Sequence, residues 1–490
     1  IDGDHLHGIL VGLGLVREAL APPRAAVRLT GLSGMGKTRF AQALFDPRVG
    51  NGALDPSLVI YGDAGLEKAV SPVRLAQSLV EDGVAAILIV DNCPANRHRE
   101  LVEIIQRPTS RVRLLTIDFD VGDHQPDHTE VFRLQNAGEN LIDALLRQRA
   151  PFLTHSERIR MVEFAGGNTR IALAIALAPR GAKGIVGLKN SELLDRLFLK
   201  DRRDPDLELR RVARAASLVY AFSIEGEEAP EAVALAELAG VSEVLFHEKM
   251  ADLLDRGLAQ QRGAQRAILP PAISAWLAAE ALDKLPRSRL MAAFGAFPPR
   301  LQRSFARRLG LLQGVKAAVE IAETLLSPGG HFADPSDDNG NEMRAARHLA
   351  PLAPILALDL AERVIASGRK LESWHPHRGE LRRLLVNIAY DPVHFERAVD
   401  LLAILARTET ADQRHYESVR DKILPMFHIQ RSGTHATPQQ RFAVIDKWLA
   451  STEPQIRDLG LDALDTALET RFAGADPQVE FGAERRDSGW

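Results

Sequence analysis

The chain has 490 residues, of which 46% are hydrophobic, 26% charged and 5% aromatic, and this composition predicts several helix-rich domains. Its net charge of -4 provides no global attraction to nucleic acid, and its single cysteine, Cys93, excludes a disulfide framework and favours a reducing, cytoplasmic location. No apolar run reaches the roughly 18 residues of a membrane span, so we expect no membrane partner.

The first part of the chain has the pattern of an α/β domain. We expect residues 1–24 to be a lead-in that follows an effector domain outside this sequence. Over residues 25–150, short β-rich runs alternate with helical patterns, which predicts a parallel sheet. The five strand-like runs are VRLT, SLVIYGD, AAILIVD, RVRLLTI and VFRL.

The rest of the chain is predicted to be mostly helical. Residues 151–205 read as a small all-helical domain, and residues 206–290 as a winged-helix domain of three helices and a hairpin, the first helix covering LRRVARAASLVYAF. Residues 291–490 resemble degenerate helical-hairpin repeats, the pattern of a solenoid-like sensor region. The segment HFADPSDDNGNE within them is predicted to be a flexible loop. The expected fold class is therefore multidomain, α/β plus α.

The segment GLSGMGKT between the first strand and a helix fits the P-loop or Walker A pattern G-x-x-x-x-G-K-[ST]. Its glycines allow backbone N–H groups to surround the β-phosphate, its lysine reaches β and γ oxygens, and its threonine offers a hydroxyl to Mg²⁺. We therefore predict binding of ATP or ADP with Mg²⁺. The predicted nucleotide-binding residues are Gly31, Ser33, Gly34, Met35, Gly36, Lys37, Thr38 and Arg39.

A second motif completes the predicted site. The hydrophobic strand AAILIVD ends at Asp91, which we expect to hold Mg²⁺ together with Thr38, as a Walker B carboxylate does. Many ATPases that perform work place Glu or Asp next, to polarise the attacking water, whereas this chain has Asn92. Because the Asn92 amide can orient the attacking water but cannot accept its proton at neutral pH, the sequence predicts slow hydrolysis.

The following strand, in LLTIDFD, adds further candidates. Asp118 and Asp120 are expected at the same edge of the sheet, either as groups that partly replace the missing carboxylate or as solvated strand ends. Thr116 is a candidate sensor of the γ-phosphate, with simple strand packing as the alternative.

These motifs, with GGNTR in the helical domain, resemble the STAND class of signalling NTPases, relatives of AAA+ machines that include NLR immune receptors. The segments GLSGMGKTRFAQALFD, AILIVDNCP and FAGGNTRIALAIA are most similar to bacterial antiviral STAND proteins of the Avs type. The resemblance covers residues 25–290 by motif. It implies a nucleotide-controlled switch whose repeats bind a trigger, such as a phage protein, and which then forms homo-oligomers.

The resemblance also gives residues 151–205 the role of a lid. In AAA+ relatives an arginine after a GG pair contacts the γ-phosphate, which makes Arg170 the candidate lid sensor, with a surface arginine as the alternative. The chain departs from NLR-type members in three places. In the lid, Thr169 replaces a proline, and the fourth strand lacks the arginine that those members have at its end. In the winged helix, Pro270 and Pro271 stand near the position of a histidine.

Three hypotheses of function remain open. The first is the STAND switch with slow ATP hydrolysis. The second is an AAA+ ATPase acting on DNA, although the predicted recognition helix LFHEKMADLLDRG is acidic, which makes DNA binding a poor expectation. The third is a scaffold that retains ADP without catalysis.

Overall fold

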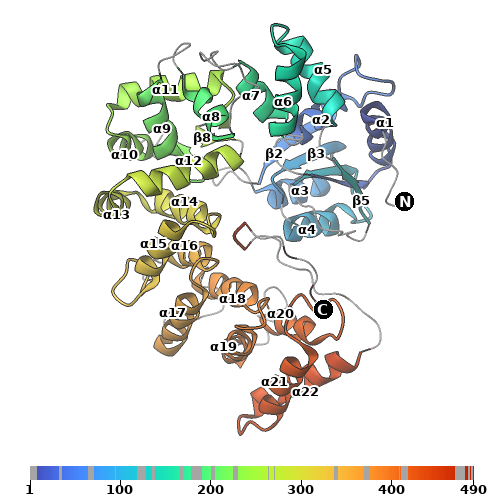
Figure 1. Ribbon diagram of the computed structural model, residues 1–490. Coiled ribbons are helices and arrows are strands. Elements are labelled where there is room, and N and C mark those ends of the chain that lie inside the picture. Colours follow the sequence, from blue (N-terminus) through green and yellow to red (C-terminus); the bar gives the residue numbers. More distant parts are fainter. Residues whose placement is uncertain are drawn as a thin grey trace. The chain divides into compact units, whose positions relative to one another are not determined.

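The protein is described here by a computed structural model (Figure 1). The chain divides into two compact units, Ile1–Arg203 and Asp204–Trp490. The described residues are 8–31, 36–64, 71–93, 95–118, 128–134, 138–165, 169–177, 190–199, 205–224, 230–262, 264–269, 271–335, 340–368, 376–407, 409, 418–469, 481–483, 486 and 489.

The first unit contains a parallel sheet of five strands in the order β2-β3-β4-β1-β5. All five predicted strands are present and every neighbouring pair is parallel. The central strands are buried on both faces, which explains why their sequences are continuous apolar runs. The strands are β1 (Ala26–Thr30), β2 (Val59–Asp63), β3 (Ala86–Asp91), β4 (Val112–Ile117) and β5 (Glu130–Arg133).

Helices cover both faces of this sheet (Figure 1). Alternate residues of β3 enter two different cores: Leu88 and Val90 pack with α3 and α4, while Ile87 and Ile89 lie in the core formed with α1 and α2. The helices of this unit are α1 (Ile9–Ala19), α2 (Lys37–Ala43), α3 (Pro72–Glu81), α4 (Ala95–Ile105), α5 (Glu139–Arg149), α6 (His155–Ala165), α7 (Thr169–Leu177) and α8 (Asn190–Asp195), with 3₁₀ turns η1 (Pro56–Leu58) and η3 (Arg196–Phe198).

Helix α1 belongs to the predicted lead-in, yet it packs on the sheet through Leu13 and Val16. Its Arg17 is buried and donates from Nε to the carbonyl of Leu44 at 3.0 Å and from Nη2 to that of Ala43 at 2.8 Å. These carbonyls belong to the C-terminal end of α2, where helix carbonyls lack partners within the helix. Arg17 therefore ties α1 to the helix that follows the P-loop.

The second unit begins with helices around a three-stranded antiparallel sheet of order β6-β8-β7. The predicted first helix is too long: α9 ends at Ser217 and Phe222 lies in β6. The backbone N–H groups of Tyr220 and Ala221 instead donate to Ser304, which explains the end of the helix. These elements are α9 (Leu207–Ser217), β6 (Phe222–Ser223), α10 (Pro230–Ala239), α11 (Glu243–Asp255), β7 (Ala259–Arg262), β8 (Gln265–Ile268) and α12 (Pro271–Lys284).

An array of helices follows, as the repeat pattern predicted. In one row α14 contacts α16 and α16 contacts α18, and in a second row α15 contacts α17 and α17 contacts α19. The helices are α13 (Arg287–Ala296), α14 (Pro299–Gly310), α15 (Lys316–Leu326), α16 (Asn341–Leu349), α17 (Pro354–Ser367), α18 (Pro376–Ile388), α19 (Phe395–Arg407), α20 (Arg420–Ile423), α21 (Pro438–Leu449) and α22 (Pro454–Leu468), with the 3₁₀ turn η6 (Leu424–Phe427).

The segment predicted as a flexible loop between α15 and α16 starts with core residues. Phe332 is buried, and its ring centroid lies 5.8 Å from that of Phe294. Residues 336–339 of this segment lie outside the described part of the chain. Among the described helices, none is long and apolar enough to cross a membrane.

Candidate functional site

The two ends of the P-loop are glycines whose backbone geometry demands glycine. Gly31 has φ 144°, and a Cβ atom there would lie 2.4 Å from the carbonyl oxygen of Leu134. Gly36 has φ 88° and immediately precedes α2. Both φ values are positive, a range in which residues with a side chain are strained. The first and last glycines of the loop therefore have backbone conformations that only glycine adopts readily. The predicted loop residues Ser33, Gly34 and Met35 lie outside the described residues.

Lys37, the P-loop lysine, is the first residue of α2. Its Nζ donates a hydrogen bond to the carbonyl oxygen of Gly31 at 2.6 Å. Burial lowers the pKa of Lys37, while the negative charges of Asp91 and Asp118 act in the opposite direction. The two predicted carboxylates thus act electrostatically on the lysine that is expected to hold the phosphates.

Thr38 and Asp91, the two predicted Mg²⁺ ligands, lie in contact. The Thr38 hydroxyl donates to Asp91 Oδ2 at 3.0 Å, although 53 residues separate them in the sequence. The carboxylate is buried and also accepts a hydrogen bond from the backbone N–H of Asn92 at 2.9 Å. A hydroxyl and a carboxylate held together form the hard oxygen donor set that Mg²⁺ prefers, so these residues fit the expected metal.

Tyr61 is a member of this group that the sequence did not predict. It lies on β2, and its hydroxyl donates to the same Oδ2 atom of Asp91 at 2.8 Å. Oδ2 therefore accepts from two hydroxyl groups, those of Thr38 and Tyr61. A metal ion that binds this oxygen competes with both donors.

Asn92, which follows Asp91, has φ 53°, a left-handed conformation that asparagine tolerates better than most residues. Its side-chain Nδ2 donates to Asp63 Oδ1 at 2.7 Å. Asp63 is the last residue of β2 and pairs in register with Asp91. The amide therefore neighbours a carboxylate that the sequence analysis did not select, and the water-orienting role of Asn92 stays a prediction.

Thr116 and Asp118 both contact Arg28, a residue of β1 that sequence reasoning missed. Arg28 is 1% exposed, and its Nη2 lies 2.8 Å from Asp118 Oδ2. Its Nη1 donates to the carbonyl of Cys93 at 3.1 Å and lies 3.5 Å from the hydroxyl of Thr116. One buried arginine thus joins the ends of β3 and β4 to the strand before the P-loop. The predicted sensor and polarising roles remain predictions.

His98 of α4 lies on the other side of Thr116. Its Nδ1 is 2.8 Å from the Thr116 hydroxyl and its Nε2 is 2.9 Å from that of Thr129. Burial, with the positive charges of Arg28 and Arg99, lowers the pKa of His98 to about 3. The imidazole is therefore neutral at physiological pH.

Cys93 is fully buried two residues after Asp91, and burial raises the pKa of its thiol to about 12. The thiol is therefore protonated, as expected for a packing residue.

Two further predicted residues, Arg39 and Arg170, belong to helices α2 and α7. Arg39 is exposed on α2 and donates to Gln42 Oε1 at 3.1 Å. Arg170 is the second residue of α7, and the glycines and asparagine of its motif, residues 166–168, lie outside the described residues. Nucleotide contacts for both arginines stay predictions.

No protein-family model matches the sequence, and no curated protein matches it. The structure is similar to a Signal Transduction ATPase with Numerous Domains (STAND) protein with a tetratricopeptide repeat sensor from Pyrococcus horikoshii, at 13% identity over 95% of this chain and 77% of that one, with a TM-score of 0.38. It is also similar to a Walker-type ATPase from Pyrococcus abyssi, at 11% identity over 56% of this chain and 96% of that one, with a TM-score of 0.26.

Proposed function

We propose that this protein is a nucleotide-dependent molecular switch of the STAND type, which binds ATP or ADP with Mg²⁺ in its first unit. The observation that carries the proposal is the 3.0 Å contact between the Thr38 hydroxyl and Asp91 Oδ2, beside Lys37. A P-loop threonine and a strand-end aspartate in contact form the Mg²⁺ site of P-loop NTPases. Lys37 supplies the positive charge for the β- and γ-phosphates.

We propose slow hydrolysis, because the polar groups near Asp91 are already bonded. Asn92 replaces a general base, and its amide donates to Asp63. Asp118, the candidate substitute, accepts from the buried Arg28. A carboxylate paired with a guanidinium is a weaker base for water than a free one. Slow turnover suits a switch, since it preserves the ATP-bound signalling state.

The proposed trigger is a partner protein that binds the helical array of the second unit, and the proposed output is homo-oligomerisation in the cytoplasm. By resemblance to Avs-type proteins, we propose antiphage defence as the setting and a phage protein as the partner. Near-complete switching requires the trigger and ATP together to favour the active state by about 5.5 kcal/mol.

An AAA+ ATPase acting on DNA is the alternative, and the charges of α11 argue against it. Lys249, the lysine of that helix, lies 2.9 Å from Asp206 and 3.7 Å from Asp252. Its charge is therefore largely neutralised within the protein. The same helix carries Glu243, Glu248 and Asp255, which repel phosphates.

The test is to denature purified protein, identify any released nucleotide by chromatography, and then follow single-turnover ATP hydrolysis with and without DNA. Bound ADP and slow, DNA-independent turnover are expected. Lys37→Ala should abolish nucleotide binding, whereas Arg48→Ala, which removes the same charge from an exposed side chain of the same unit, should not. Rapid DNA-stimulated turnover would favour the alternative, and partner-induced assembly of Lys37→Ala would favour a scaffold.

A further inference from the structure

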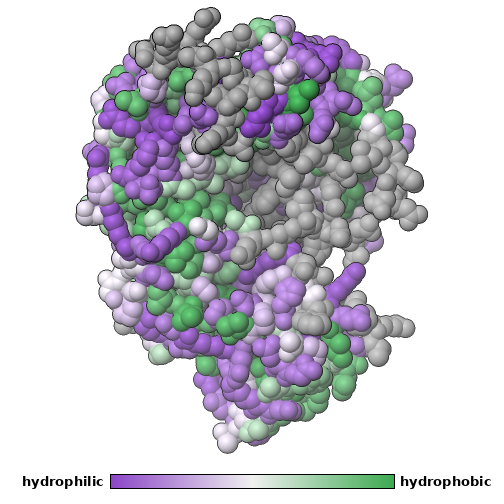
Figure 2. Space-filling model, in the orientation of Figure 1, coloured by the Kyte–Doolittle hydropathy of each residue, from purple (hydrophilic) through white to green (hydrophobic). Residues whose placement is uncertain are grey.

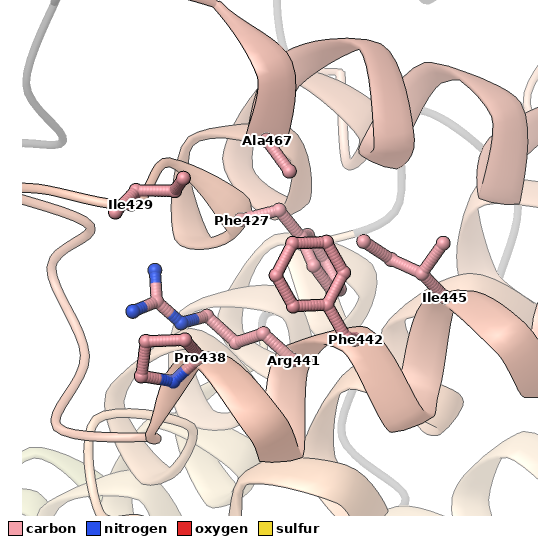
Figure 3. Close-up of a pocket in the computed structure, with 7 residues that line it drawn as sticks. All are labelled: Phe427, Ile429, Pro438, Arg441, Phe442, Ile445 and Ala467. Carbon is pink, nitrogen blue, oxygen red and sulfur yellow. The ribbon is translucent and has the colours of Figure 1, made fainter.

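The helical array of the second unit has a mixed surface and a small pocket. Over α21 and α22, hydrophobic and hydrophilic residues are interspersed, as the lower part of Figure 2 shows. The pocket lies between η6, α21 and α22, and Arg441 is the charged residue among those that line it (Figure 3). Arg441 is 2% exposed and donates to the carbonyl oxygen of His428, so no ligand reaches it from solvent. By contrast, Asn92, beside the proposed Mg²⁺ ligand Asp91, is exposed.

Asn92 is held against the end of the neighbouring strand β2. Its backbone N–H donates to Asp91 Oδ1 at 2.9 Å, and its side-chain Nδ2 donates to Asp63 Oδ1 at 2.7 Å. Asp63 is 4% exposed and pairs in register with Asp91, so the carboxylate that accepts from the amide is itself buried. Two hydrogen bonds therefore fix Asn92 relative to the proposed Mg²⁺ ligand.

The chemistry of Asp63 determines which atom of the Asn92 amide is left for a ligand. A carboxylate only accepts hydrogen bonds, so the amide nitrogen is the atom that faces Asp63. The amide oxygen, Oδ1, lies on the other arm of the planar group, and it has no hydrogen-bond partner among the described residues. Without the carboxylate, the amide could rotate by half a turn and present its NH₂ group instead. Asp63 thus makes Asn92 an acceptor toward solvent.

An acceptor at this place suits an attacking water molecule. A water that donates a hydrogen bond to Oδ1 of Asn92 keeps the lone pairs of its own oxygen for the γ-phosphorus, whereas an NH₂ group would occupy one of them. The water oxygen then bonds to the γ-phosphorus, the bond from that phosphorus to the bridging oxygen breaks, and ADP leaves. Because the amide accepts no proton, both protons of the water depart with the phosphate.

We propose that Asp63 is a positioning residue for ATP hydrolysis, which orients the Asn92 carboxamide so that its Oδ1 binds the attacking water. The inference rests on the proposed nucleotide function and adds to it a residue that acts through Asn92. It gives the pair a definite polarity, with the acid at the end of β2 and the amide directly after β3. Exchanging the two side-chain types should therefore place a carboxylate beside the water and supply the missing proton acceptor.

Two substitutions with the same loss of charge separate orientation from charge. Asp63→Asn keeps an oxygen that accepts from the Asn92 amide, whereas Asp63→Leu has none. In single-turnover hydrolysis, Asp63→Asn should keep about half of the wild-type rate, because two amides pair in two orientations and one of them is productive. Asp63→Leu should be about tenfold slower than the wild type. Asp82→Asn, the same charge loss at an exposed residue of the first unit, should match the wild type.

Binding of ADP with aluminium fluoride, which imitates the phosphoryl group in transfer with its attacking water, gives a readout without turnover. Relative to ADP alone, this complex should bind about tenfold more weakly to Asp63→Leu than to the wild type, and about twofold more weakly to Asp63→Asn. Failure of the wild type to bind ADP would reject the proposed nucleotide function and this inference with it. Binding of ADP, with equal affinities of the three proteins for the fluoride complex, would reject the role of Asp63 alone.

The double variant Asp63→Asn, Asn92→Asp reverses the pair, and it decides the question if Asp63→Leu does not fold. The amide at position 63 would donate to the carboxylate at position 92, which should raise the rate of hydrolysis about tenfold or more above the wild type. Asn92→Asp alone places two carboxylates in contact and should be slower than the double variant. A double variant no faster than Asn92→Asp would overturn the proposal. A loss of rate in Asp63→Asn as large as in Asp63→Leu would equally overturn it, because hydrolysis would then require the charge of Asp63.

Discussion

Arg28 of β1 forms an ion pair with Asp118, the residue that directly follows β4, with 2.8 Å between Nη2 and Oδ2 and side chains that are 1% and 12% exposed. Arg28 stands on β1 directly opposite Thr116 of β4. An ion pair therefore connects β1, which leads into the P-loop, to the end of β4, the strand that contains the candidate γ-phosphate sensor Thr116.

Arg28→Met should lower the free energy of unfolding of the first unit by about 3–5 kcal/mol, because it leaves Asp118 without its buried partner. Urea unfolding measures the change, with the exposed Arg48→Ala as a control that should match the wild type. The double variant Arg28→Met, Asp118→Leu should recover part of the loss. A change of under about 1 kcal/mol in Arg28→Met would contradict a stabilising pair.

His98 predicts a specific pH dependence of stability. Its pKa is lowered from 6.5 to about 3 in the folded protein, so below pH 6.5 the unfolded chain takes up a proton that the folded one does not. The contribution is fully present above 6.5 and falls by about 1.4 kcal/mol for each pH unit below it, down to about 3.

His98→Gln removes this titration. We expect the stability difference between His98→Gln and the wild type to shrink by about 1 kcal/mol between pH 6.5 and 5.5, as measured by urea unfolding at each pH. A difference that is constant over this range would show that His98 titrates normally in the folded state.

Tyr61→Phe tests the competition at Asp91. The Tyr61 hydroxyl donates to Oδ2, so removing it frees a lone pair of the carboxylate for the metal. We expect nucleotide binding in Tyr61→Phe to need about threefold less Mg²⁺, which corresponds to one modest hydrogen bond. Titration of Mg²⁺ with a fluorescent ADP analogue measures this, and Tyr220→Phe in the second unit is the control. A higher Mg²⁺ requirement would mean that Tyr61 orients the carboxylate for the metal.

Asn92 allows backbone strain to be separated from side-chain bonding. Asn92→Gly loses the hydrogen bond to Asp63 but suits φ 53°, whereas Asn92→Ala loses the bond and places a Cβ in an unfavourable conformation. Both variants should be less stable than the wild type, with Ala worse than Gly by about 1 kcal/mol. Chemical denaturation of the three proteins decides this, and equal stability of the two variants would exclude strain at this position.

The sequence predicted the five strands, and it also selected Thr38 and Asp91, which the structure brings into contact, because both sets follow from local patterns with a fixed mechanism. It did not predict Arg28, Tyr61 or Asp63, since each is a single polar residue at a strand position whose partner depends on strand order. Arg28 was visible as a charge within the apolar run VRLT. Its partner lies 90 residues away and becomes evident only when β4 is known to neighbour β1.

In the second unit, the helical repeats were predictable from periodicity, whereas the end of α9 was not. The residues after Ser217 are apolar and compatible with a helix, but their backbone N–H groups bond to Ser304, more than 80 residues later in the chain. Arg441 was equally invisible in the sequence, because an arginine in an amphipathic helix is normally exposed and its burial depends on η6 and α22.

Because Cys93 is buried, its reaction with a dye can report local opening of the protein around it. Cys93 is the one cysteine of the chain and follows Asp91 by two residues. Its backbone carbonyl accepts a hydrogen bond from Arg28, and its thiol is buried with a pKa of about 12. A thiol-specific dye should therefore label the native protein only during rare openings around the ends of β3 and β4. Because no second cysteine competes for the dye, the labelling rate follows that region alone, and no foreign probe has to be introduced.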